Sequence, residues 1–79
     1  MSEADKMFEE LGYKKEIIES EVNDEVTIMY IKRFVYEYDS KIINFKLKKK
    51  IVEIKYSIDM QDLQAINLKC KELGWIEEW

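Results

Sequence analysis

The sequence predicts an α+β fold: a helix, three or four antiparallel strands in a meander, and a second helix. Two short segments near the ends, 10–13 and 72–75, each read Glu-Leu-Gly followed by an aromatic residue, and they contain both glycines of the 79-residue chain. A glycine just after a helix accepts the left-handed backbone conformation that ends it, and the following aromatic residue folds back on the last turn. Between these segments, apolar residues alternate with others as strands require.

We expect the first helix over residues 3–11. Ser2 can cap its N-terminus, and acidic residues occupy its first turn, where the helix dipole favours them. Four apolar residues recur at helical spacing and form one stripe, which we interpret as a core face: Ala4, Met7, Phe8 and Leu11.

Four strands are expected at about 13–20, 26–36, 41–47 and 51–56. The second of these is the clearest, because Ile28 and Tyr30 lie on one face while Met29 and Ile31 lie on the other. Both faces are substantially apolar, which is typical of a central strand or of a strand covered by a partner. Short strands with short connections predict an antiparallel meander.

The second helix should begin near Asp59, a good N-cap residue with Asp62 three positions on. Its expected buried stripe consists of Leu63, Ile66, Cys70 and Leu73. Because each helix has only one apolar stripe to bury, we expect both helices to pack on one face of the sheet.

Composition limits the chemistry. The length indicates a single domain over 1–79. One cysteine excludes an internal disulfide, and the lack of a signal peptide or a membrane-length apolar run predicts a cytoplasmic protein without a membrane segment. The chain has no histidine, the commonest general base and metal ligand, and both glycines are used at helix ends rather than in a phosphate loop. We therefore expect no enzyme activity, no catalytic residue, no cofactor and no metal.

One face of the expected sheet would remain without cover. If the Tyr30 face meets the helices, an apolar set on the other side is left exposed, and we expect a homodimer or a partner protein to bury it. We expect further apolar contacts from Tyr38 at the end of the second strand, from Leu68 outside the buried stripe of the second helix, and from the C-terminal Trp79. The partner-binding candidates are Met29, Ile31, Val35, Tyr38, Leu68 and Trp79.

Charge is unevenly distributed around a net charge of −4. Acidic residues in 16–25 either form a solvated loop or steer the chain toward a basic protein surface. Four lysines cluster at the turn between the third and fourth expected strands, and they either keep this hairpin tip soluble or contact an anion. The anion-contact candidates are Lys46, Lys48, Lys49 and Lys50. The overall acidity makes nucleic acid the less favoured partner.

The segments Asp59 to Trp75 and Ala4 to Tyr13 resemble short proteins encoded by phages and prophages of low-GC Gram-positive and related bacteria. Such proteins are mostly of unassigned function, and the resemblance carries no catalytic residue. It implies a non-enzymatic protein that binds a host protein stoichiometrically, for example an inhibitor of a bacterial immune system of the anti-CRISPR kind. The alternative is a nucleic-acid or nucleotide-binding module that uses the lysine-rich hairpin.

Overall fold

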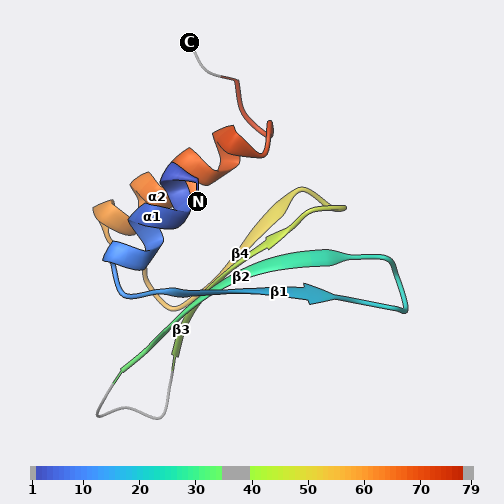
Figure 1. Ribbon diagram of the computed structural model, residues 1–79, viewed down its shortest axis with the longest axis horizontal. Coiled ribbons are helices and arrows are strands. Elements are labelled where there is room, and N and C mark those ends of the chain that lie inside the picture. The colour runs from blue at the N-terminus through green and yellow to red at the C-terminus, as the bar shows by residue number, and fades with distance from the viewer. Residues whose placement is uncertain (1, 35–39, 78–79) are drawn as a thin grey trace.

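The computed structural model describes residues 2–34 and 40–77. In this part of the chain two helices and four strands follow in the order α1 (Glu3–Glu10), β1 (Lys14–Glu19), β2 (Val26–Arg33), β3 (Ser40–Lys46), β4 (Ile51–Lys55) and α2 (Met60–Glu72). The strands form one open antiparallel sheet in the order β1-β2-β3-β4. Both helices lie on the same side of this sheet (Figure 1). The predicted α+β meander is confirmed.

Local sequence signals define where the helices begin. The Ser2 side chain accepts a hydrogen bond from the Asp5 backbone N–H at 3.0 Å at the start of α1. At the start of α2, Asp59 and Asp62 form a capping box, in which each side chain accepts a hydrogen bond from the other residue's backbone N–H. Both N-caps agree with the prediction, because a cap depends only on residues within one turn.

The two glycines end the helices as the sequence predicts. Gly12 and Gly74 adopt φ values of +96° and +75°. The Tyr13 N–H donates to the Phe8 carbonyl at 2.9 Å, and the residue after Gly74 makes the equivalent bond, also at 2.9 Å, to the carbonyl five positions back. This is the Schellman arrangement, which satisfies carbonyls that the helix leaves free.

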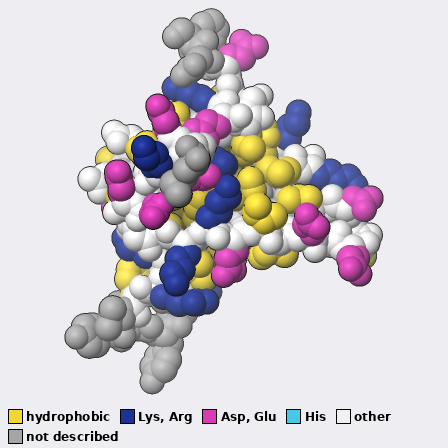
Figure 2. Space-filling model, in the orientation of Figure 1, with side chains coloured by type: hydrophobic (Ala, Val, Ile, Leu, Met, Phe, Trp, Pro, Cys, Tyr) yellow, Lys and Arg dark blue, Asp and Glu magenta, His cyan; other side chains and the backbone are white. Residues whose placement is uncertain are grey.

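The core lies between the helices and the sheet. Phe8 of α1 stacks on Tyr30 of β2 with ring centroids 3.9 Å apart, and Phe45 of β3 packs edge-on against both rings. The coverage is incomplete, because Ile17 of β1 remains 60% exposed on the same side of the sheet. Figure 2 shows hydrophobic side chains gathered beside the helices on the face in view. The buried apolar residues are Ala4, Phe8, Tyr13, Ile28, Tyr30, Ile43, Phe45, Ala65 and Ile66.

The buried side of α2 differs from the predicted stripe. Leu63 is 44% exposed, whereas Asp62 and Lys69 are buried together with Ala65 and Ile66. The prediction for Leu63 was wrong because two polar residues of α2 have partners beneath the helix that periodicity cannot reveal. The remaining predicted positions, Ile66, Cys70 and Leu73, do pack into or against the core.

Candidate functional site

The candidate site is the side of the sheet that faces away from the helices, here called the open face. Directly paired residues in a sheet share a face, and Ile28, Tyr30, Ile43 and Phe45 belong to the core. The open face therefore consists of the alternating positions, and none of its residues is buried. These positions are Lys14, Glu16, Ile18, Thr27, Met29, Ile31, Arg33, Ser40, Ile42, Asn44, Lys46, Ile51, Glu53 and Lys55.

The centre of the open face is apolar. Met29 and Ile31 on β2 lie beside Ile42 on β3, and all three side chains are partly exposed. None of them is among the apolar residues that pack against the core. The sequence prediction that Met29 and Ile31 lie opposite the helices is therefore correct, and Ile42 extends the same patch onto the next strand.

The edges of the open face carry a regular order of charge. The register gives three rows across the sheet, and each row begins on β1 and ends on β4 with the same residue type. One row has Ile18 and Ile51 at its ends, the next has Glu16 and Glu53, and the third has Lys14 and Lys55. Acidic and basic rows thus lie next to each other, about 7 Å apart for positions two residues along a strand.

One buried polar atom of the open face has no hydrogen-bond partner among the described residues. The Oδ1 atom of Asn44, in the acidic row, is buried and accepts no hydrogen bond from any described residue. Such an oxygen is uncommon, because buried polar atoms are normally paired. One ion pair lies on this face, between Lys46 and Glu53.

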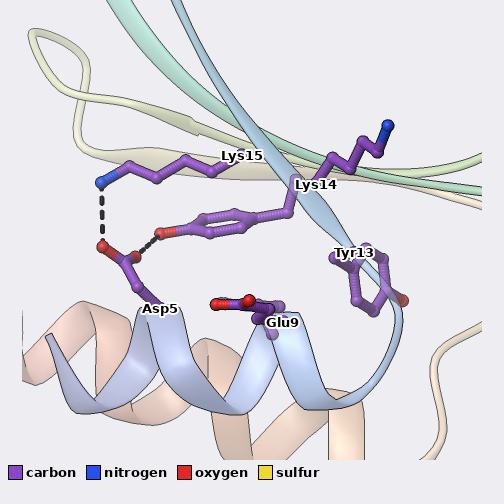
Figure 3. Close-up of a pocket in the computed structure, with 7 residues that line it drawn as sticks. Asp5, Glu9, Tyr13, Lys14 and Lys15 are labelled. Atoms are coloured by element: carbon purple, nitrogen blue, oxygen red, sulfur yellow. Dashed lines mark hydrogen bonds and ion pairs between the residues drawn. The ribbon is translucent and has the colours of Figure 1, made fainter. Parts of the chain in front are cut away.

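The covered side contains a polar centre at Asp5. Its carboxylate accepts hydrogen bonds from the Tyr30 hydroxyl and from the Lys15 and Lys69 ammonium groups, the latter two at 2.9 and 3.3 Å. It lines a pocket of about 540 Å³ between α1 and β1, where Lys15 reaches over to Asp5 while the Lys14 amine points away from the helix (Figure 3).

Burial alone would raise the pKa of Asp5, but the hydrogen bonds from Tyr30 and Lys15 and the charge of Lys69 hold it well below its usual range. Burial, together with the bond to Asp5, raises the pKa of the Tyr30 hydroxyl. The Asp5 carboxylate is thus a stable anion that joins α1 to β1, β2 and α2, rather than a base available to a substrate.

A second polar centre surrounds Asp62 of α2. Its carboxylate accepts hydrogen bonds from the Tyr13 hydroxyl at 2.9 Å and from the Lys41 ammonium group of β3. Burial opposes ionisation, but the Lys41 and backbone hydrogen bonds lower the Asp62 pKa below its usual value. Burial and the bond to Asp62 raise the pKa of Tyr13. This centre ties α2 to the sheet and to the end of α1.

The four lysines predicted to contact an anion have different surroundings. Lys46 pairs with Glu53 on the open face. The Lys48 ammonium group donates to the Asn23 carbonyl at 3.0 Å, and its backbone N–H donates to the Glu25 carboxylate at 3.1 Å. Lys49 and Lys50 are exposed at the β3–β4 turn.

The acidic segment 16–25 is also divided among different surroundings. Glu25 is only 6% exposed and holds the β3–β4 turn through its bond to the Lys48 backbone. Glu16 lies on the open face, whereas Glu19 lies on the covered side of the same edge strand. The other acidic residues of the segment are exposed in the loop. The segment therefore presents no single acidic surface.

Of the remaining partner-binding candidates, the structure describes only Leu68, which lies apart from the open face. Leu68 is a partly buried residue of α2 outside the core cluster. Val35, Tyr38 and Trp79 lie outside the described residues. Sequence reasoning missed the edge charges Lys14, Glu53 and Lys55 and placed Glu16 only in the acidic segment 16–25, although opposite charges two residues apart on each edge strand were a visible signal.

Within residues 2–34 and 40–77, no group of three or more acidic, cysteine or histidine side chains is placed to hold a metal ion. Neither described helix has the length and apolarity that crossing a membrane would need. No family model, curated protein or solved structure matches the chain. The resemblance to phage-encoded proteins stays a prediction, and the case for function depends on the geometry of the open face.

Proposed function

We propose that this chain is a non-enzymatic protein-binding domain that contacts its partner through the open face. The observation that carries this proposal is the position of both helices on one side of a sheet whose central strand β2 is apolar on both faces. Met29 and Ile31 therefore form the middle of a surface that no described element covers. Contiguous apolar surface on a sheet face is typical of a protein contact site.

The charges around this centre favour a folded protein as the occupant. The open face carries Lys14, Arg33, Lys46 and Lys55 alongside Glu16 and Glu53. Glu16 and Glu53 oppose a nucleic acid or an anionic lipid surface where they lie, so the face is of mixed sign rather than the uniformly basic surface that such polyanions favour. A protein surface with an apolar centre and charges of both signs at its rim matches the face on both counts.

A matched pair of methionine substitutions tests this proposal. Met29→Asp places a charge in the centre of the open face, whereas Met60→Asp places the same charge on a 68% exposed residue of α2. We measure association of each tagged chain with proteins of a bacterial lysate and with an untagged copy of itself. Met29→Asp should abolish an association that the native chain and Met60→Asp retain.

Circular dichroism and thermal unfolding of Met29→Asp check that the fold is retained. If the native chain associates with no protein, or if Met29→Asp associates as well as Met60→Asp, the proposal is wrong. Inhibition of a bacterial immune protein and anion contact by the lysine-rich hairpin stay predictions. The latter requires binding that weakens steeply with salt and is lost in Lys49→Glu.

A further inference from the structure

We propose that the occupant of the open face is a second copy of this chain, packed face to face about a two-fold axis that runs across the strands. This inference rests on the proposed function and names its partner. It follows from the order of side chains along the two edge strands. On β1 the alternate positions read Lys14, Glu16, Ile18, and on β4, which runs the opposite way, they read Lys55, Glu53, Ile51.

A two-fold axis across the strands sets each strand of one subunit against the same strand of the partner subunit. It also reverses the order of the rows, so that one row faces a different row of the partner. If the axis passes between the acidic and the basic row, Glu16 meets Lys14 of the partner subunit, and Glu53 meets Lys55 of the partner subunit. By symmetry each contact occurs twice. All four kinds of side chain are exposed at the sheet edges, where long side chains can adjust to the angle of about 30° between packed sheets.

The same axis closes the apolar centre. Met29 lies over Ile31 of the partner subunit, and the reverse contact follows from the symmetry. Ile42 on β3 lies over the partner's Asn44 in the same way. An apolar centre with a charged rim is the usual anatomy of a protein interface, and a two-fold interface must be complementary to itself.

The charges also exclude the other simple alignment. A two-fold axis parallel to the strands, passing between β2 and β3, keeps each row over itself and sets β1 over the partner's β4. Glu16 would then meet Glu53 of the partner subunit, and Lys14 would meet the partner's Lys55. Four like-charge contacts would surround the centre, which is unfavourable at close range.

The size of the face predicts a weak dimer. The open face has four strands of five to eight residues, which places it at the lower end of the range for specific interfaces. We therefore expect a monomer–dimer equilibrium at micromolar concentrations, and we expect dimerisation to weaken as salt screens the rim contacts.

Exchange of charge in one row at a time tests the alignment. One double variant, Lys14→Glu with Lys55→Glu, makes the edge residues of both charged rows acidic. The other double variant, Glu16→Lys with Glu53→Lys, makes the edge residues of both rows basic. Each variant alone should be a monomer, because like charges would meet across the interface. Mixed in equal amounts, they should form a heterodimer with a dissociation constant within about tenfold of the native dimer, since opposite charges meet again.

The readout is sedimentation velocity from low micromolar to high micromolar protein, at low and at physiological salt. The four substituted side chains are exposed, and circular dichroism of each variant confirms the fold. Glu53→Lys also removes the exposed ion pair with Lys46, which should cost little. A dimer in the native chain and in the mixture, with monomers in the separate variants, supports the proposal.

Three results overturn it: a native chain that stays monomeric at all concentrations, separate variants that still dimerise, or a mixture that does not associate. If the native chain is monomeric but Met29→Asp abolishes binding of a different protein, the second copy is the wrong partner and the proposed function stands. If the native chain dimerises and Met29→Asp dimerises equally well, the dimer uses another surface and the face-to-face dimer is wrong, while the proposed function then depends on whether Met29→Asp abolishes binding of a different protein.

Discussion

The two sides of the sheet use the same alternating strands in different ways. Under the helices, Asp5 and Asp62 are enclosed and each accepts hydrogen bonds from a tyrosine and at least one lysine. On the open face, Glu16 and Glu53 lie at exposed edges around an apolar centre. Charge on the covered side fixes where the helices sit, while charge on the open side is available to another molecule.

The difference teaches how a small sheet can separate folding from binding. Ile42 and Ile43 are neighbours in the sequence, yet Ile43 is fully buried in the core and Ile42 belongs to the open face. Substitutions on opposite faces should therefore have separable effects, on folding in one case and on association in the other.

The largest expected contrast concerns the ion pairs of the two faces. Asp62→Ala removes a carboxylate that is 2% exposed and leaves Lys41 and the Tyr13 hydroxyl without their acceptor. We expect a loss of about 3–5 kcal/mol in the free energy of unfolding. Glu53→Ala breaks the exposed pair with Lys46 and should change that free energy by less than about 1 kcal/mol. Urea unfolding of both variants at neutral pH measures the contrast, and equal losses would contradict it.

The neighbouring isoleucines provide the next comparison. Ile43→Ala leaves a cavity in the core and should reduce the free energy of unfolding by about 2–5 kcal/mol. Ile42→Ala should cost less than about 1 kcal/mol in dilute solution, where the proposed dimer would be dissociated. If a second copy covers the open face, the difference in the free energy of unfolding between the native chain and Ile42→Ala should grow with protein concentration. A cost for Ile42→Ala that equals that of Ile43→Ala would remove the distinction between the faces.

Stability should depend on pH through the covered side. The pKa values of Asp5 and Asp62 are lowered from 3.8 in the folded chain. Their contribution to the free energy of unfolding is therefore complete above about pH 3.8 and is lost as the pH falls below that value. The pKa values of Tyr13 and Tyr30 are raised from 10.0, so their contribution is present below pH 10 and is lost above it. Thermal unfolding from pH 2 to 11 should show a plateau between these limits, with effects smaller than those of Asp62→Ala.

Asp5→Asn is the control for the acid limb. It should lower stability at neutral pH and flatten the decline below pH 3.8, because the amide at this position no longer titrates. An acid limb unchanged in Asp5→Asn would show that this carboxylate does not contribute to it.

The smallest expected contrast is between the glycines that end the two helices. Gly74→Ala places a Cβ at φ +75°, where no heavy atom lies within 4 Å, so the cost is conformational only and should be about 1–2 kcal/mol. Gly12→Ala at φ +96° meets Lys32 at an ordinary contact distance of 3.5 Å and should cost about the same. Thermal unfolding of both variants measures this. A much larger loss for one of them would mean that its aromatic neighbour, rather than the backbone, governs the helix end.

Much of the fold was predictable because its signals are local. The caps at Ser2 and Asp59 and the turns at Gly12 and Gly74 each involve bonds within six residues. The two-residue period of a strand was enough to place Met29 and Ile31 opposite the core. The third residue of that apolar centre, Ile42, and the charged rows required the register, which sets residues of four strands side by side.

The sequence by itself determined the order of the elements, their ends and the opposite facing of alternate residues on β2, since each depends on backbone preferences over one turn or one strand. Only the tertiary structure decided that Asp62 rather than Leu63 turns inward, because the partners of Asp62 come from positions 49 and 21 residues away. It also decided that Lys14 and Lys55 end one row of the open face and that Glu16 and Glu53 end the next. Such rows arise from strand register, which forms only when distant segments of the chain come together.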